Sequence, residues 1–459
     1  MRQRDLTQGS IYGNLIYMAL PTMFGFFSQM LFNVVDMIFV GMISAEAVAG
    51  VTIYGTISVI IYVFNDIIGT SSISLISQSY GQGDLDKTAR VVEQTITFKG
   101  LVALLAGGFM LIFLKPLTHF FTADAVTFKA AMDYGYIRTF FLPIMFSSYT
   151  VNTAMRCIGD SKKPLYIMIF VSILNVVLDP LLMFDTMPFI TWFGTPIPGF
   201  GMGVFGAALA TVISSTVAFL IAFWLLIRGK TYIKINLRNL LKLDKEIDYK
   251  LITIGLPSGF EGLNRNLANF ILFKMIAFYG TPFVAAYGIV IRLVDMCFMP
   301  LMGLNMGGSA IVGQNIGAND YKRVKKTVHA AAILGVVATL IIAILAFIFA
   351  KPIVGIFIQD AEVIAIGALL IRWLIPSMIF LSVMFGFGTA FSGSGYNTPF
   401  FIASVVSRWL FLIPIGVVAT YVLKTSFRGL LVAYIISEMV DMSVVLYHYK
   451  KGKWLTKRV

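Results

Sequence analysis

Long apolar segments recur along the whole 459-residue chain and constrain its fold more than any other feature. Most run for about 20 residues or more, the length that an α-helix needs to cross the roughly 30 Å hydrocarbon core of a bilayer. Hydrophobic residues make up 58% of the chain and charged residues only 12%, whereas a soluble globular domain carries about 25% charged residues. A membrane β-barrel would instead show segments of about 10 residues that alternate apolar and polar positions. The pattern therefore predicts an all-α integral membrane protein.

We predict twelve transmembrane helices and no appended soluble domain. The expected spans are 15–41, 50–78, 92–113, 130–154, 165–184, 205–227, 251–278, 283–311, 327–349, 363–391, 399–421 and 427–447. The first apolar stretch continues past Pro21 without a cleavage site of the A-x-A type. We therefore expect a retained first helix rather than a signal peptide.

Lysine and arginine are distributed unequally between the predicted loops. The segments on the side of the two termini contain most of these residues, and the opposite loops contain only Lys115, Lys129, Lys351, Lys424 and Arg428. Short cytoplasmic loops collect Lys and Arg, so we expect a multi-pass protein of the cell membrane with both termini in the cytoplasm. The net charge of +13 then reflects this orientation and attraction to anionic lipid. We expect no nucleic-acid partner.

The two halves of the chain repeat each other without a gap over a long stretch. Pro21 matches Pro257, and QSYGQGDLDKTARVV at 78–92 matches QNIGANDYKRVKKTV at 314–328. Each repeat holds six predicted helices, an even number, so both copies enter the membrane from the same side. We therefore predict two pseudo-symmetric six-helix bundles that face a central cleft.

The predicted lobes are 1–227, with helices 1–6, and 251–459, with helices 7–12. A basic cytoplasmic linker at 228–250 joins them, either as an amphipathic segment on the membrane surface or as a simple loop. Two bundles around a midplane cleft are typical of a transporter that alternates access by rocking one bundle against the other. A channel would more often be an oligomer of short subunits with a filter motif.

Two aspartates lie deep in predicted helices of the first lobe, Asp36 in LFNVVDMIFVG and Asp179 in NVVLDPLLMF. An ionised carboxylate at the centre of a membrane helix costs roughly 2.5–3.5 kcal/mol even on lenient scales. The repeat places Leu272 opposite Asp36 and Ile413 opposite Asp179. The repeated fold therefore does not require these acids, which favours a role in function.

Amides accompany both acids. Asn33 precedes Asp36 by three residues and Asn175 precedes Asp179 by four, so each amide shares a helix face with its carboxylate. We predict that the two acids form one cation site, in which H⁺, Na⁺ or a cationic substrate neutralises the carboxylates. We expect no cofactor beyond this coupling ion, H⁺ or Na⁺.

Other charged residues inside predicted helices are weaker site candidates. Glu261 and Arg265 are four residues apart, and Arg292 and Asp295 are three apart, spacings that allow pairing within one helix. Whether Glu261 and Arg265 serve structure or function stays open from the sequence. Asp66 has no evident partner, so Asp66 and Glu261 remain secondary candidates.

No pattern typical of an enzyme is evident. Cys157 and Cys297 make neither a disulfide framework nor a thiolate metal site. GMGVFG at 201–206 matches G-x-G-x-x-G, but no βαβ unit surrounds it, so we do not predict a dinucleotide site. The three histidines are scattered and lack metal-ligand spacing. An integral membrane enzyme would need a nucleophile or a metal cluster, so we expect no catalysis.

Five motifs in order resemble those of a known family, and they span nearly the whole chain. They are VGMISAEAVAG (40–50), QSYGQGD (78–84), RCIGDSKKP (156–164), NVVLDP (175–180) and GMGVFGAALAT (201–211). Together they are similar to the multidrug and toxic compound extrusion (MATE) transporters. The resemblance implies a V-shaped, twelve-helix exporter of the MATE/MOP fold that moves small cationic or amphiphilic drugs by antiport with H⁺ or Na⁺. We expect it to act as a monomer in contact with membrane lipid.

The resemblance also implies roles for particular residues. The implied cation site, which would also hold Na⁺, comprises Asp36, Asn175, Asp179 and Thr211. Tyr136 or Tyr134 is expected to line the same cavity. Pro21 is expected to mark a bend in the first helix.

The second lobe departs from part of the family pattern, and this departure indicates the branch of the family. The predicted span 363–391 has no acid, and Glu261 lies only four residues after Pro257, so the chain is more similar to the DinF-like than to the NorM-like branch. The loop at 185–201 is unusually long for the family. The nearest rival is a lipid-linked precursor flippase of the same superfamily, which typically has fourteen helices and a cationic cavity. We expect twelve helices and an anionic cavity.

Overall fold

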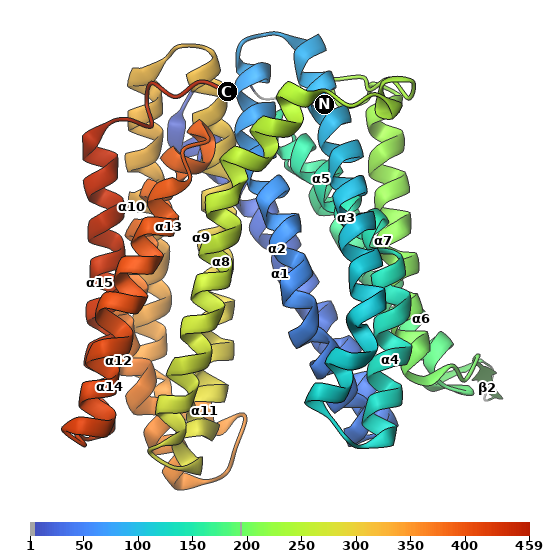
Figure 1. The fold of residues 1–459 in the computed structure, drawn as a ribbon, viewed down its shortest axis with the longest axis vertical. Coiled ribbons are helices and arrows are strands. Elements are labelled where there is room, and N and C mark those ends of the chain that lie inside the picture. Colours follow the sequence, from blue (N-terminus) through green and yellow to red (C-terminus); the bar gives the residue numbers. More distant parts are fainter. Residues whose placement is uncertain (1–4, 193–194) are drawn as a thin grey trace. The chain divides into compact units, whose positions relative to one another are not determined.

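The computed structural model describes residues 5–192 and 195–459, and these residues are almost entirely helical (Figure 1). The α-helices are α1 (Ile11–Ile43), α2 (Ala45–Gly81), α3 (Leu85–Phe121), α4 (Ala125–Phe140), α5 (Leu142–Cys157), α6 (Lys162–Met183), α7 (Gly203–Ile227), α8 (Lys245–Ala277), α9 (Thr281–Gly317), α10 (Tyr321–Ile348), α11 (Ala350–Gly355), α12 (Ala361–Ser394), α13 (Thr398–Val405), α14 (Ile413–Val417) and α15 (Phe427–Lys451). The other elements are a 3₁₀ turn η1 (Asn239–Leu241), the π-helical stretches η2 (Val406–Leu412) and η3 (Val418–Val422), and the strands β1 (Thr186–Trp192) and β2 (Thr195–Pro198).

Within the described residues, ten helical stretches are long and apolar enough to cross a membrane. They coincide with ten of the predicted spans, and α13 to η3 form one of these stretches, Thr398–Val422. The remaining predicted spans, 130–154 and 251–278, correspond to α4 with α5 and to α8. All twelve predicted spans are therefore helical, and the prediction of an all-α integral membrane protein is confirmed.

The predicted span 130–154 is interrupted at Phe141, which separates α4 from α5. Pro143 lies in the first turn of α5. Proline has no N–H to donate and its φ already suits a helix start, so it is tolerated there but breaks a continuous helix. The break gives two helices of 16 residues that carry Arg138 and Arg156 in their last turns, where a positive charge is favoured by the helix dipole.

The internal repeat is visible at the helix starts. Asp84 caps α3 and Asp320, its match in the repeat, caps α10; each accepts a backbone N–H from three residues further on, at 2.8 and 2.9 Å. Asp124 and Asp360 cap α4 and α12 in the same way, at 2.7 and 3.0 Å. A side chain at this position satisfies a backbone donor that the helix cannot. The two copies therefore start equivalent helices with the same chemistry.

The chain forms two compact units. Unit 1 contains the start of α1 as far as Met23, Ile73–Gly83 and Thr253–Val459, and unit 2 contains Phe24–Ser72 and Asp84–Ile252. Helices α1 and α2 thus contribute segments to both units. The lobe boundaries predicted from the sequence, at 227 and 251, remain a prediction.

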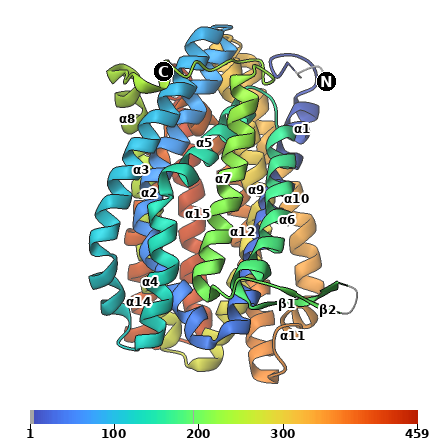
Figure 2. The same ribbon diagram turned by 90° about the vertical axis from the view of Figure 1, so that its right-hand side faces the viewer.

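Each unit has its own apolar core. In unit 1, α9 and α10 both pack against α12, and α15 packs on α12 as well (Figure 1). In unit 2, α3 packs against α5, and α6 runs beside α7 (Figure 2). A Cβ at Gly206 of α7 would lie 2.6 Å from the carbonyl oxygen of Leu182 on α6. A small residue is therefore needed where these two membrane helices approach.

The long loop between α6 and α7 contains an antiparallel hairpin of β1 and β2 (Figure 2). After β2 the chain returns to the end of α6. The backbone N–H of Phe200 donates to the carbonyl of Leu181 at 2.9 Å, and that of Met202 donates to Leu182 at 2.8 Å. The hairpin is thus an insertion whose two ends lie close together, and α7 begins directly beside the end of α6.

The linker at 228–250 is mainly a loop. It contains the single turn η1, and α8 begins at Lys245. Within unit 2 it is fixed to α3, because Glu93 accepts the backbone N–H of Asn236 and Thr97 donates to the carbonyl of Leu240 at 2.7 Å. A position of this segment on the membrane surface remains a prediction.

Candidate cation and substrate site

Helices α1 and α6 bring Asp36 and Asp179 together inside unit 2. Asp36 is 6% exposed and Asp179 is fully buried, and the two carboxylates are close enough to interact electrostatically. In the described part of the chain, the Oδ1 atom of each has no hydrogen-bond partner. A buried carboxylate oxygen without a donor is costly. Both oxygens are therefore suited to take up a proton or to coordinate a small cation.

Asn175 connects Asp179 to α7. When its amide is oriented to satisfy its neighbours, Nδ2 donates to Oδ2 of Asp179 at 2.8 Å and Oδ1 accepts the backbone N–H of Thr211 at 3.3 Å. The Thr211 hydroxyl donates to the carbonyl of Ala207 at 3.1 Å. Three predicted site residues are thus linked, and the hairpin between α6 and α7 does not displace Thr211.

The other residues expected around this site take different positions. Asn33 lines a cavity in unit 2 that also contacts Asn175 and Thr211. Tyr134 is 3% exposed and accepts a hydrogen bond from Arg138 at 2.7 Å. Tyr136 is 45% exposed and, among the described residues, is not part of the wall of this cavity.

Pro21 and Asp66 are the two further candidates from the sequence. Pro21 is half-buried inside α1, which is assigned as one continuous helix, so a bend there remains a prediction. Asp66 is exposed and accepts a hydrogen bond from Asn65 at 3.2 Å. It also interacts electrostatically with Lys99. Asp66 therefore has an opposite charge nearby, contrary to what the sequence indicated.

The cavity in unit 2 has a volume of about 230 Å³. Its wall includes amides, hydroxyls and aromatic rings from α1, α2, α5, α6 and α7. In the described ranges, the formally charged side chains of the wall are Arg138 and Arg156, and neither Asp36 nor Asp179 is part of it. In the described residues this wall is therefore cationic rather than anionic as expected, and the two carboxylates are buried in the same unit without lining it.

Arg138 lies between two cavities, since it also lines a more open one of about 460 Å³ with Tyr134. Its guanidinium donates to the hydroxyls of Tyr134 at 2.7 Å and Tyr62 at 3.5 Å. It interacts electrostatically with Asp36, but no ion pair within 4.0 Å joins them in the described structure. Asp36 thus interacts electrostatically with Arg138 but is not held in an ion pair with it.

Sequence reasoning missed the cations of this unit. By position, Arg156 follows the predicted span 130–154 and begins a basic segment, which is typical of a loop residue that orients the chain, yet it is 4% exposed in the last turn of α5. Lys99 is fully buried on α3, with its Nζ 4.6 Å from the ring centroid of Tyr149. A lysine several residues inside the apolar span 92–113 was the available signal for Lys99.

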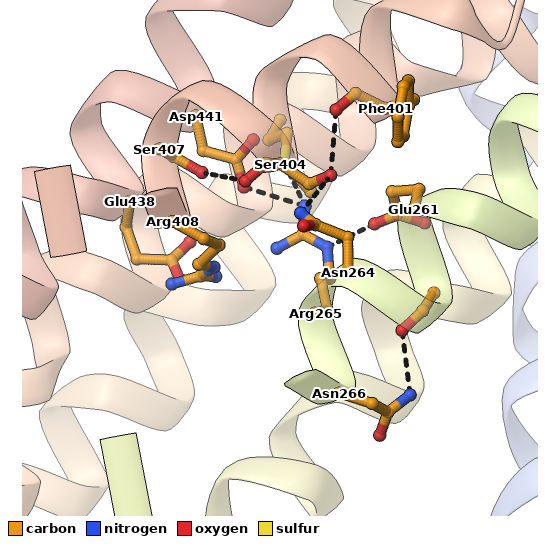
Figure 3. Close-up of polar contacts among 12 residues, drawn as sticks. Glu261, Asn264, Arg265, Asn266, Phe401, Ser404, Ser407, Arg408, Glu438 and Asp441 are labelled. Atoms are coloured by element: carbon orange, nitrogen blue, oxygen red, sulfur yellow. Dashed lines mark hydrogen bonds and ion pairs between the residues drawn. The ribbon is translucent and has the colours of Figure 1, made fainter. Parts of the chain in front are cut away.

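Unit 1 contains a separate buried charge cluster, shown in Figure 3. Arg265 of α8 pairs with Glu261 one turn earlier and with Asp441 of α15 at 2.8 Å. Arg408 of η2 pairs with Glu438 of α15 at 2.5 Å. The predicted pairing of Glu261 with Arg265 is confirmed, and α8 is thereby tied to α15.

The second pairing predicted from helix spacing was wrong. Within the portions of the chain that the structure describes, Arg292 and Asp295 of α9 form no ion pair. Spacing of three residues allows a contact but does not impose one, because each side chain can take another rotamer.

Many membrane-spanning helices, an internal repeat, a polar cavity and a pair of buried carboxylates in the same unit are typical of membrane transport proteins. The profile of the MatE family matches residues 21–181 and 257–418, one match in each repeat. The chain belongs to this family of multidrug efflux transporters.

Comparison with individual proteins agrees with this assignment. The chain is 25% identical over 453 residues to the probable multidrug resistance protein YoeA of Bacillus subtilis, covering 98% of this chain and 96% of that one. It is 26% identical over 452 residues to the FAD transporter of Shewanella oneidensis, covering 95% and 93%. A solved MATE structure in complex with MaD5 has the same fold, with a TM-score of 0.87, 21% identity and 98% coverage of both chains. Relatives with such different named substrates do not identify the substrate of this chain.

Proposed function

We propose that the protein is a secondary active multidrug transporter that exports cationic or amphiphilic compounds by antiport with H⁺ or Na⁺. It would work by alternating access, as a monomer in the cell membrane with both termini in the cytoplasm. The observation that carries the proposal is the pair of buried carboxylates, Asp36 and Asp179, each with an oxygen that has no hydrogen-bond partner among the described residues. The name of YoeA as a probable multidrug resistance protein supports drug-like substrates.

The coupling follows from the cost of buried charge. With both carboxylates ionised, Asp36 and Asp179 repel each other in a medium that screens charge poorly. Binding of a cation removes that repulsion, so the loaded and empty states differ in free energy and can favour different conformations of the transporter. Asn175, which contacts both Asp179 and the backbone of Thr211, transmits the change from α6 to α7.

The groups around Asp179 suit either coupling ion. Carboxylate and amide oxygens are hard ligands of the kind that bind hard cations, and Asp36, Asp179, Asn175 and Thr211 supply such oxygens from α1, α6 and α7. A carboxylate also accepts a proton directly. The donor set therefore supports cation coupling without selecting between H⁺ and Na⁺.

Export from proteoliposomes under separately imposed gradients tests this proposal. We expect accumulation or loss of a fluorescent amphiphilic drug to depend on one cation gradient, of H⁺ or of Na⁺, and to stop when that gradient is collapsed by an ionophore. Liposomes without protein supply the background rate. Drug movement at the same rate with and without both gradients would contradict secondary active transport.

A flippase for lipid-linked precursors is the second candidate, and one observation favours it. The wall of the 230 Å³ cavity carries Arg138 and Arg156, which suit an anionic headgroup. A fluorescent lipid-linked phosphate in the same proteoliposomes separates the two candidates. Export of the soluble drug, with no change in the leaflet distribution of the lipid, supports the transporter.

A further inference from the structure

Arg156 is a buried guanidinium without a counter-anion. It is 4% exposed, and in the part of the chain that is described it forms no ion pair. Among the described residues its Nε has no hydrogen-bond partner, and its Nη2 donates to the sulfur of Met168, at 3.2 Å. The guanidinium also lies 5.5 Å from the ring centroid of Phe26. A thioether and a ring compensate a positive charge poorly, so this arrangement is costly.

The neighbouring carboxylates already face other cations. Asp36 interacts electrostatically with Arg138, and Asp66 interacts with Lys99. The titratable groups that act on Arg156 are instead Tyr149 and Cys157, which are neutral in their ordinary protonated forms. Among the described residues, Arg156 thus has the favourable C-terminal end of α5 but no carboxylate partner, while Arg138 and Lys99 each interact with a carboxylate.

The cavity that Arg156 lines can hold an anion together with an aromatic body. Phe26, Phe146 and Tyr149 line it with rings, and Asn152 on α5 adds an amide one turn before Arg156. Its volume of about 230 Å³ is slightly below the roughly 300–1,000 Å³ of sites that enclose a drug-sized ligand. It fits a ring system with one charged group rather than a long lipid.

We propose that Arg156 binds the carboxylate of an aromatic amphiphile, and that this cavity therefore selects anionic or zwitterionic substrates. The planar fork of arginine matches a carboxylate through two parallel hydrogen bonds, and the free Nε supplies one of the donors. The proposal rests on the proposed transport function and narrows its amphiphilic substrates to those that carry a carboxylate. It concerns binding alone, so it can fail while cation-driven export stands, and the reverse is equally possible.

Equilibrium binding to the purified full-length protein in lipid nanodiscs tests the proposal. The probe is 7-(diethylamino)coumarin-3-carboxylate, and its ethyl ester serves as the matched uncharged ligand. Empty nanodiscs correct for partition into lipid. Hydrogen bonds to a charged group lead us to expect that the wild type binds the carboxylate about tenfold or more tightly than the ester.

Substitutions of Arg156 test whether this residue causes the preference for the carboxylate over the ester. R156Q should remove the difference between carboxylate and ester, and R156K should retain part of it, because lysine keeps the charge but loses the fork. R228Q is the control, since Arg228 is an exposed arginine at the end of α7 in the same unit and should change nothing. If R156Q does not fold, the ratio of ester to carboxylate Kd in the wild type and in R156K still tests the proposal. Equal binding of acid and ester by the wild type, or an unchanged preference in R156Q, would overturn the assignment.

Discussion

D179N should reduce gradient-driven export to the background of protein-free liposomes, and D36N should do the same. The substitutions keep side-chain shape but remove a group that ionises and binds a proton or cation, so no cation gradient can act on the site. Asp179 is fully buried with an unpartnered oxygen, and the Asn175 amide that donates to it can donate equally to an amide oxygen. The measurement is initial efflux rate in proteoliposomes under an H⁺ or Na⁺ gradient.

Two controls make this loss specific. D86N removes an exposed carboxylate from the first turn of α3 in the same unit, and it should export at the wild-type rate. Exchange of labelled for unlabelled substrate without a cation gradient should persist in D36N and D179N if they fold and bind. Wild-type export by both variants would show that the coupling site lies elsewhere.

The second large effect is expected in unit 1, on stability rather than on coupling. R265Q removes the ion-pair partner of Asp441, which is fully buried, and of Glu261. Breaking a buried pair from one side typically costs about 3–5 kcal/mol, because the remaining charge is left uncompensated. We expect a clearly lower unfolding temperature for the purified protein, with tryptophan fluorescence as the readout.

A double variant tests whether the uncompensated charge causes this loss. R265Q with D441N should unfold at a higher temperature than R265Q alone, because replacing both partners is less costly than removing one. K250Q breaks the more exposed pair with Glu246 at the start of α8 and should cost less than about 1 kcal/mol. If R265Q unfolds like the wild type, or if the double variant is no better than the single, the cluster does not stabilise the fold.

Features set by local sequence were predictable. The spans follow from length and hydropathy, and the two copies follow from residues such as Asp84 and Asp320, which cap equivalent helices in both repeats. Asp36 and Asp179 could be selected because a carboxylate within an apolar helix is costly and therefore rarely accidental. The structure adds that both are buried in one unit and interact.

Features that depend on distant residues were not predictable. Arg408 pairs with Glu438 thirty residues away, and Arg265 with Asp441 at a separation of 176 residues, so no local pattern marks either contact. Arg156 follows an apolar span and precedes a basic loop, and by position alone it resembles a residue that sets orientation. Only packing shows that its side chain is buried beside Phe26 and Met168.

The charges of unit 2 have different expected roles. The carboxylates of Asp36 and Asp179 are buried, do not line the cavity and are suited to a small cation, whereas Arg156 forms part of the cavity wall. This arrangement allows the coupling ion and the substrate to bind without competing for the same atoms. Cation binding then changes the affinity for substrate by changing the conformation of the protein. Because such coupling is reciprocal, substrate binding changes the affinity for the cation by the same free energy.

Substrate-driven cation flux is the most direct test of the central claim that transport is coupled through the buried pair of aspartates. Proteoliposomes with equal H⁺ and Na⁺ on both sides receive a substrate gradient, and a dye sensitive to pH or to Na⁺ reports the interior. We predict that one cation moves opposite to the substrate in the wild type and that this movement disappears in D179N. Substrate movement without any cation movement in the wild type, or equal cation movement in D179N, would contradict the account.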